Sequence, residues 1–205
     1  MSPRPYNLGK RHEQVDQGRR QILDAARELL RQTTSYNAFT LDAVAKRADV
    51  ARGTVYYQFR SKTGLLEAIC DDLGDSAGLA DLAAAFADPD PHSALAEFIA
   101  CFARLWQADR PVMRRLRALA ALDPDVHTVI AARDQRRREG LDVLLGRFTS
   151  GNSLDSATLQ QTLPVLLALT SFETFDTIAG PDRDIFEVTP DIVRLASIAL
   201  DSPSA

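Results

Sequence analysis

The chain has 205 residues, of which 45% are hydrophobic and 25% are charged, and its formal net charge is −4. This balance is that of an ordinary globular protein. No apolar run approaches the ~20 residues of a membrane-spanning helix, and the chain begins without the apolar segment of a signal peptide, so we expect a cytoplasmic protein with no membrane partner.

The charge is distributed unevenly along the chain. Residues 1–62 contain twelve Lys and Arg against six Asp and Glu, a net charge of +6, whereas residues 63–205 contain twelve against twenty-two, a net charge of −10. Ordinary surface variation could produce such a difference. A basic excess confined to one segment is also typical of a surface that binds a polyanion such as DNA.

The first 16 residues contain two prolines and no apolar periodicity, which predicts a flexible basic arm. Its cations, Arg4, Lys10 and Arg11, could contact DNA or could only aid solubility. A first helix is predicted over residues 17–32. Its buried stripe would consist of Ile22, Ala25, Ala26, Leu29 and Leu30.

Residues 40–59 predict two short helices joined by a tight turn. In the first, Leu41, Val44, Ala45 and Ala48 recur at helical spacing, and Thr40 precedes them as an N-cap. The second helix, residues 52–59, is ~12 Å long, which is close to the width of the major groove of B-DNA. Two short helices crossing in this way are typical of a helix-turn-helix motif.

The two faces of the second helix differ in composition. Val55 and Phe59 lie one turn apart and would face the core. Gly53 and Tyr57 occupy the opposite face, and a glycine there costs helix stability, roughly 1 kcal/mol against alanine. A glycine on the outer face therefore indicates a surface that another molecule approaches closely.

The run from Thr40 to Leu66 resembles the DNA-binding signature of the tetracycline-repressor-like (TetR-type) regulators. The matching positions are Thr40, Ala45, Ala48, Val50, Gly53, Tyr56, Tyr57, Phe59, Lys62 and Leu65. Two positions depart from the family pattern, namely Asp49, where glycine is usual in the turn, and Ala51, where serine is frequent. Aspartate tolerates left-handed backbone conformation better than most residues, whereas the absence of a serine cap weakens a helix start by ~0.5–2 kcal/mol.

This resemblance implies a transcriptional regulator that binds a palindromic operator in double-stranded DNA as a homodimer. It further implies a repressor, which releases the operator when an unidentified small-molecule effector binds the C-terminal domain. The residues expected to contact phosphate are Thr40 and Lys62. Those expected to approach base edges are Arg52, Thr54, Tyr56, Tyr57 and Gln58, with Gly53 allowing the helix to sit deep in the groove. Tyr56 could equally pack on the helix-turn-helix domain itself.

The remainder of the chain reads as a series of helices. They are predicted from Lys62 through Leu73, from Ser93, from Pro111, over residues 124–148, over residues 155–179 with a bend at Pro164, and from Thr189 onwards. The basic cluster at Arg133 and Arg136–Arg138 is most simply a solvated helix face. The predicted fold is all α with about nine helices, the last two of which would form the dimer interface.

Three regions follow from this pattern: the flexible arm at 1–16, a three-helix helix-turn-helix domain at 17–61, and a C-terminal ligand-binding and dimerisation domain at 62–205. The effector pocket that the resemblance implies falls where aromatic residues gather. Its candidate lining residues are Phe98, Phe102, Trp106, His127 and Phe172. Aromatic residues at helical spacing are also typical of a plain hydrophobic core.

No catalytic or metal-binding motif is present, since the three histidines are isolated and the two cysteines, Cys70 and Cys101, are not in CxxC spacing. We expect no enzyme activity, no metal and no cofactor. Two alternatives remain open: a helical interaction protein whose basic domain binds other polyanions, and a helical enzyme with a site that sequence motifs do not reveal.

Overall fold

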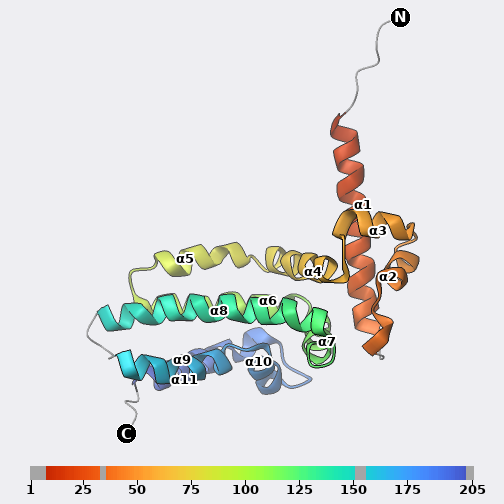
Figure 1. Ribbon diagram of the computed structural model, residues 1–205. Helices are drawn as coiled ribbons and strands as arrows, with labels where there is room; N and C mark the ends of the chain where they lie inside the picture. The colour runs from red at the N-terminus through yellow and green to blue at the C-terminus, as the bar shows by residue number, and fades with distance from the viewer. Residues whose placement is uncertain (1–7, 33–35, 151–155, 202–205) are drawn as a thin grey trace, which may run out of the picture. The chain divides into compact units, whose positions relative to one another are not determined.

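The computed structural model describes residues 8–32, 36–150 and 156–201, and these ranges contain helices and no strand (Figure 1), which confirms the all-α class. They hold eleven α-helices and two 3-10 helices, where about nine helices were predicted. In chain order these are α1 (Leu8–Gln32), η1 (Tyr36–Ala38), α2 (Leu41–Arg47), α3 (Arg52–Phe59), α4 (Lys62–Ser76), η2 (Leu79–Asp81), α5 (Leu82–Ala87), α6 (Pro91–Ala108), α7 (Arg110–Ala120), α8 (Pro124–Ser150), α9 (Ser156–Leu169), α10 (Phe172–Ala179) and α11 (Ile185–Asp201).

The described residues divide into two compact units. The first unit contains the described residues up to Cys70 together with Arg115–Val129, and the second contains Asp71–Arg114 and the described residues from Ile130 onwards. The predicted helix-turn-helix domain, residues 17–61, lies within the first unit. That unit also includes the end of α7 and the start of α8, which the sequence did not associate with it.

The core of the first unit is built from the predicted apolar stripes. α1 packs on α2, and α2 packs on α3. Ile22 and Leu30 of α1, Val44 of α2 and Val55 of α3 are fully buried, and Phe59 is almost fully buried. α2 and α3, with seven and eight residues, are too short to be stable alone, so the core that they share with α1 holds the motif together.

The first helix is longer than predicted. α1 begins at Leu8, so residues 8–16, which were predicted to belong to a flexible arm, are its first turns. The segment lacks an apolar stripe, and the prediction relied on such a stripe. Arg4, the first cation of the predicted arm, lies outside the described residues.

Two further differences explain the larger helix count. A short helix, α5, lies between α4 and α6, in a stretch where no helix was predicted. The long helix predicted over residues 155–179 is two helices, because the chain breaks at Thr170–Ser171, and Ser171 then caps α10 by accepting a hydrogen bond from the backbone N–H of Thr174 (3.2 Å). Pro164, the predicted bend, lies inside α9.

The last helix begins earlier than the predicted start at Thr189. α11 starts at Ile185, and Pro190 lies inside it. The side chain of Glu187 accepts a hydrogen bond from the backbone N–H of Asp184 (3.1 Å), which is half of a capping box. The sequence Asp184-Ile-Phe-Glu187 therefore held the correct start signal.

In the second unit α6 packs against α11 and α5, while α9 and α10 also pack on α11 (Figure 1). Gly140 of α8 lies against the ring of Phe98, because a Cβ built there would approach Phe98 Cε2 to 3.0 Å. A glycine at this position allows α8 to approach the aromatic residues of α6 closely.

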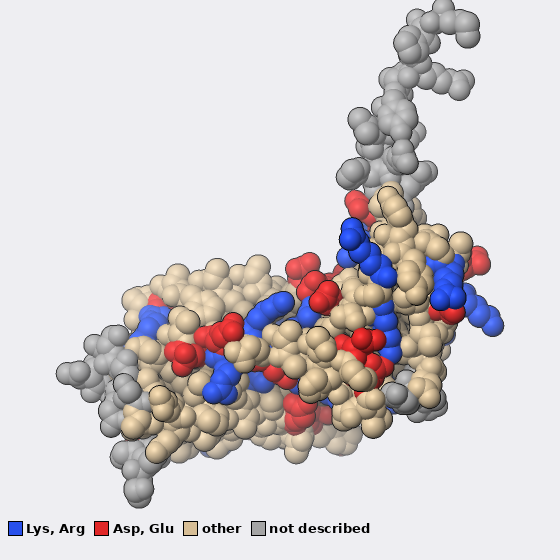
Figure 2. Space-filling view, in the orientation of Figure 1, with Lys and Arg blue, Asp and Glu red and all other residues tan. Residues whose placement is uncertain are grey.

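Acidic and basic side chains are interspersed on the face of the molecule that Figure 2 shows. Among the described residues, no helix is both long and apolar enough to cross a bilayer. In the same part of the chain, no group of His, Cys, Asp and Glu has the arrangement of a metal site.

Candidate nucleic-acid interface

The turn between α2 and α3 has the sharp conformation that the motif needs. Asp49 adopts a left-handed backbone conformation (φ 51°), as its tolerance for this conformation predicted. The backbone N–H of Val50 bonds to Ala45 O (3.1 Å), and Gln21 Nε2 of α1 donates to Ala48 O (2.7 Å). Helix α1 therefore helps to fix the direction in which α3 leaves the turn.

Helix α3 starts without a side-chain cap. Ala51 occupies the N-cap position in extended conformation, and no side-chain oxygen accepts a hydrogen bond there. The helix is instead anchored through its inner face, since Val55 and Phe59 are buried and Arg19 of α1 stacks over the Phe59 ring at 4.6 Å. Packing thus replaces the missing cap.

The outer face of α3 is open to solvent, as the sequence predicted. Tyr57 is 83% exposed and Tyr56 is 45% exposed. Arg52, Gly53 and Thr54 are also exposed, and Gln58 is half-buried. A Cβ added to Gly53 would meet no atom of the protein within 4 Å, so the core does not require a glycine there.

Arg52 is held by residues of its own motif. Its Nε lies 2.8 Å from Oδ1 of Asp42 on α2, and its guanidinium carbon lies 5.5 Å from the centre of the Tyr56 ring. A hydrogen bond with Tyr56 and the charge of Asp42 raise the pKa of Arg52. Tyr56 therefore supports Arg52 and still offers part of its ring to solvent.

Thr40 caps α2 as predicted, because its Oγ1 accepts a hydrogen bond from the backbone N–H of Ala43 (3.1 Å). The side chain is exposed. A hydroxyl that accepts from the helix still has its own proton to donate, so Thr40 can cap α2 and donate to a phosphate oxygen at the same time.

The surroundings of Lys62 differ from those expected of a residue that contacts phosphate. Its ammonium group bonds to the carboxylate of Asp123, and the two side chains are only 24% and 11% exposed. The ammonium also lies 6.0 Å from the centre of the Phe39 ring. This arrangement does not support the expected phosphate contact of Lys62, because the charge is already paired and partly buried within the first unit.

Four of the five predicted pocket residues form a packed cluster in the second unit. Ring centres are separated by 4.9 Å for Phe98 and Phe102, 5.6 Å for Phe102 and Trp106, and 5.9 Å for Trp106 and Phe172. All four are buried. His127 does not join them, since it is exposed on the part of α8 that belongs to the first unit. The four rings fill space as a core does.

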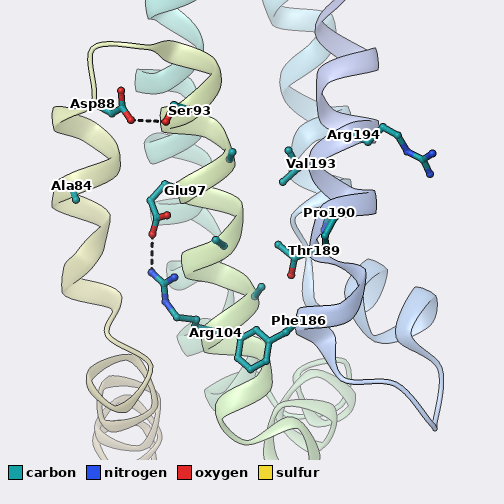
Figure 3. Close-up of a pocket in the computed structure, with 13 residues that line it drawn as sticks. Ala84, Asp88, Ser93, Glu97, Arg104, Phe186, Thr189, Pro190, Val193 and Arg194 are labelled. Atoms are coloured by element: carbon teal, nitrogen blue, oxygen red, sulfur yellow. Dashed lines mark hydrogen bonds and ion pairs between the residues drawn. The ribbon is translucent and has the colours of Figure 1, made fainter.

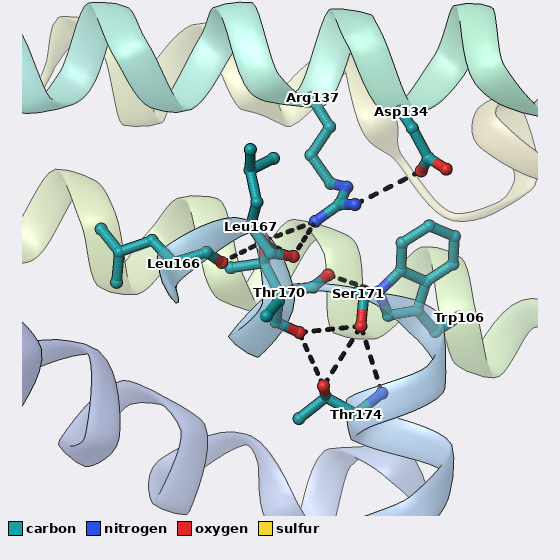
Figure 4. A network of polar contacts seen from close by, with 9 residues as sticks. Trp106, Asp134, Arg137, Leu166, Leu167, Thr170, Ser171 and Thr174 are labelled. Atoms are coloured by element: carbon teal, nitrogen blue, oxygen red, sulfur yellow. Dashed lines mark hydrogen bonds and ion pairs between the residues drawn. The ribbon is translucent and has the colours of Figure 1, made fainter. Parts of the chain in front are cut away.

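A polar network adjoins this cluster at the break between α9 and α10 (Figure 4). Trp106 Nε1 donates to Thr170 O (3.2 Å), and Arg137 Nη1 donates to both Leu167 O and Thr170 Oγ1 (2.7 Å each). Asp134 Oδ1 lies 3.3 Å from Arg137 Nη2. Arg137 is buried, so the predicted solvated face is wrong at this position: the guanidinium binds the Leu167 carbonyl and the Thr170 hydroxyl at the helix break.

A groove of about 980 Å³ lies elsewhere on the second unit, between α6 and its neighbours α5 and α11 (Figure 3). Ala96, Ala100 and Ala103 of α6 face it, with Phe186 and Val193 of α11 also lining it. Glu97 bonds to Arg104 Nη2 at 3.0 Å within it. The groove was not predicted from the sequence, although the small residues at positions i, i+4 and i+7 of one helix were a visible signal.

Cys70 and Cys101 are both buried, and no disulfide joins them. Burial raises the pKa of the Cys101 thiol to about 11, so the thiolate that oxidation and metal binding require is scarce at neutral pH.

Comparison with known proteins agrees with this geometry. Residues 22–69 match the family model described as bacterial regulatory proteins, tetR family. A search of curated proteins gave no match.

Solved structures resemble the chain over almost its whole length. The TetR family regulator PfmR from Thermus thermophilus is 22% identical, with 90% of this chain and 99% of that chain covered and a TM-score of 0.63. A TetR transcription regulator from Haloarcula marismortui is 17% identical (91% and 97% covered, TM-score 0.66). FadR from Bacillus subtilis is 18% identical (86% and 96% covered, TM-score 0.66). Residues 22–69 thus match the domain that defines the tetR family of bacterial regulatory proteins, and the chain has the fold of solved TetR transcriptional regulators.

Proposed function

We propose that the protein is a transcriptional repressor that binds a palindromic DNA operator as a homodimer and leaves it when a small molecule binds the second unit. The outer face of α3 carries this proposal. It combines a cation, two tyrosines and a threonine with an unobstructed glycine, on a helix whose length suits the major groove.

The contacts we propose divide into two kinds. Thr40, at the start of α2, donates to phosphate, which positions the motif without reading sequence. Arg52, Thr54, Tyr56, Tyr57 and Gln58 approach base edges, and Gly53 lets the helix backbone come close. Arginine suits the O6 and N7 acceptors of guanine, and a tyrosine ring or a threonine methyl suits the methyl group of thymine.

The dimer we propose uses α9, which is the first part of the helix predicted over residues 155–179, and α11, which corresponds to the helix predicted from Thr189 onwards. Val165 of α9 and Leu195 and Ile198 of α11 are 47%, 39% and 53% exposed, and α9 packs on α11, so these apolar side chains form a surface that a second subunit would cover. Ala196 of α11 is fully buried within its own chain, so it is not available to a second subunit. A two-fold dimer would match the symmetry of a palindrome.

Two places in the second unit are candidates for the effector. The four aromatic residues would have to separate to admit a ligand, whereas the groove beside α6 is already open. FadR, whose structure was solved in complex with stearoyl-CoA, shows that this fold accommodates a long acyl compound in that protein. We therefore place the effector in the groove, against Ala96, Ala100 and Ala103.

Selection from a pool of random DNA duplexes with the full chain tests the proposal. A repressor of this kind enriches one sequence with two inverted half-sites. Enrichment of no sequence, together with equal binding to DNA and to heparin, would support the polyanion-binding alternative instead.

The enriched duplex then serves to screen small molecules for release of the protein. For a compound that releases it, Ala100→Phe should abolish the response because it fills the groove, while Phe102→Leu should retain it. The reverse pattern would place the effector among the aromatic residues.

A further inference from the structure

The ion pair between Lys62 and Asp123 joins two helix starts in the first unit. Lys62 is the first residue of α4, and only two residues separate it from Phe59, the last residue of the recognition helix α3. A cation at a helix N-terminus opposes the helix dipole, so α4 by itself does not favour a lysine there. The ion pair with Asp123 compensates for this unfavourable placement.

Asp123 uses both of its carboxylate oxygens. Its Oδ1 accepts hydrogen bonds from the backbone N–H groups of Asp125 (3.0 Å) and Val126 (3.4 Å), which caps α8, while Oδ2 accepts from Lys62 Nζ. Burial by itself would raise the pKa of Asp123, but these hydrogen bonds outweigh it and hold the pKa below its usual value. The carboxylate therefore stays charged while it joins α8 to α4.

A third segment meets the same pair. The Phe39 ring, which is 1% exposed, lies under the Lys62 ammonium, and Phe39 directly precedes Thr40, the cap of α2. The position of Lys62 is thus fixed by contacts with the entry to α2 and with the start of α8. Because Lys62 follows α3 so closely, these contacts also fix the end of the recognition helix.

We propose that Asp123 is a positioning residue for DNA recognition: it holds Lys62, keeps that ammonium away from DNA phosphate, and so fixes α3 in the orientation that reads bases. This inference rests on the proposed function and adds a means of regulation. Helix α8 runs without interruption from Pro124 to Ser150 and carries Arg137 and Gly140 in the second unit. An effector that shifts α8 would disturb the carboxylate that caps it, and with it Lys62.

Two substitutions isolate the pair. Asp123→Asn removes the charge but keeps an oxygen that can cap α8, because asparagine is as good an N-cap as aspartate. Lys62→Met keeps most of the apolar stem over Phe39 and removes the ammonium. Asp125→Asn is the matched control, since Asp125 is the exposed neighbour, whose Oδ1 accepts a 3.3 Å hydrogen bond from Thr63.

The experiment measures binding of the full chain to the selected operator and to a scrambled duplex by fluorescence anisotropy, at a series of salt concentrations. Lys62→Met and Asp123→Asn should each weaken operator binding about tenfold, which is within the range of interaction energies between residues in contact. The double variant should bind no more weakly than either single variant. The salt slope should remain that of the wild type, because Lys62 releases no counterion from DNA. Asp125→Asn should bind as the wild type does.

A phosphate contact by Lys62 gives a different result. Lys62→Met would then lower the salt slope by about one, and Asp123→Asn would leave binding unchanged or strengthen it. Either outcome, or additive effects in the double variant, overturns the inference. If Asp123→Asn does not fold, the salt slope of Lys62→Met decides alone. If the wild-type protein binds the operator and the scrambled duplex equally well, the proposed function itself is refuted.

Discussion

Asp42 of α2 holds Arg52 of α3 across the turn of the helix-turn-helix motif, with 2.8 Å between Oδ1 and Nε. Arg52 is the first residue of the recognition helix, and its guanidinium also stacks on Tyr56. The side chain is thereby ordered before DNA is present. Ordering a long side chain in advance lowers the entropic cost of binding, so Asp42 should affect recognition without touching DNA.

Asp42→Ala should therefore reduce sequence discrimination. Removal of the carboxylate frees Arg52 from its fixed position and also removes a negative charge from a surface that we propose faces phosphate. We expect binding to scrambled DNA to strengthen slightly and the ratio of operator to scrambled affinity to fall severalfold, within the ~0.5–3 kcal/mol typical of coupled contacts. Competition anisotropy with the two duplexes measures this ratio.

Asp24→Ala controls for the change of charge. Asp24 is exposed on α1, in the same unit, and the substitution removes one carboxylate without freeing Arg52. If both variants change the ratio equally, net charge explains the effect and the positioning of Arg52 does not.

Gly53→Ala should have opposite effects on the stability of the protein and on its affinity for the operator. The added methyl group meets open space, so the variant should be more stable by up to about 1 kcal/mol, because alanine is the better helix former. If α3 lies deep in the major groove, operator affinity should nevertheless fall. Thermal unfolding and operator binding of the same preparation test both halves.

Gly18→Ala provides the matched comparison. Gly18 lies in α1 and also has open space at its Cβ, so the substitution should bring a similar gain in stability. Operator affinity should stay unchanged. Unaltered binding by Gly53→Ala would show that α3 does not approach DNA as closely as we propose.

Ile198→Asp should convert the dimer into a monomer. Ile198 is exposed on α11 within the proposed interface, and a buried unpaired carboxylate at its centre would be costly. Val143→Asp is the control, because Val143 is a similarly exposed apolar residue on α8, outside that interface. Sedimentation at micromolar concentration should find a dimer for the wild type and Val143→Asp. A monomeric wild type would refute the dimer.

Asp176 should contribute to stability in a pH-dependent way. Burial by itself would raise its pKa, but hydrogen bonds from Arg114 and Arg110 outweigh burial and lower it. A carboxylate with a lowered folded-state pKa stabilises the fold above its unfolded pKa of ~3.9, and this stabilisation is lost as the pH falls through the folded-state value.

Asp176→Asn should therefore lower the melting temperature at about pH 6, and the difference from the wild type should shrink as the pH falls from about 4 towards about 2. Asp182→Asn, an exposed carboxylate in the following turn, should match the wild type throughout. A difference between Asp176→Asn and the wild type that stays constant with pH would show that the two arginines do not stabilise the ionised form.

The helix-turn-helix motif was predictable because the signals that define it are local. The apolar stripes of α2 and α3 can each be recognised within a short stretch of sequence. The same holds for Asp49, a residue type that tolerates left-handed backbone conformation. The start of α11 was also encoded locally, by Asp184 and Glu187, but Thr189-Pro190 offered a competing signal.

The features that the sequence did not reveal depend on residues far apart in the chain. Lys62 and Asp123 are 61 positions apart, and Arg137 and Thr170 are 33 positions apart. A lysine after a recognition helix and an arginine in a charged run both have plausible surface roles in isolation. Only the packing of helices places a carboxylate beside the first and a helix break beside the second.

The most direct test of the account is the effect of Arg52→Ala on binding to the selected operator and to scrambled DNA at one salt concentration. We predict a loss of ~1–3 kcal/mol on the operator, little change on scrambled DNA, and relaxed preference at one base pair in each half-site. An equal loss on both duplexes would make Arg52 a phosphate contact and would contradict base reading by the start of α3.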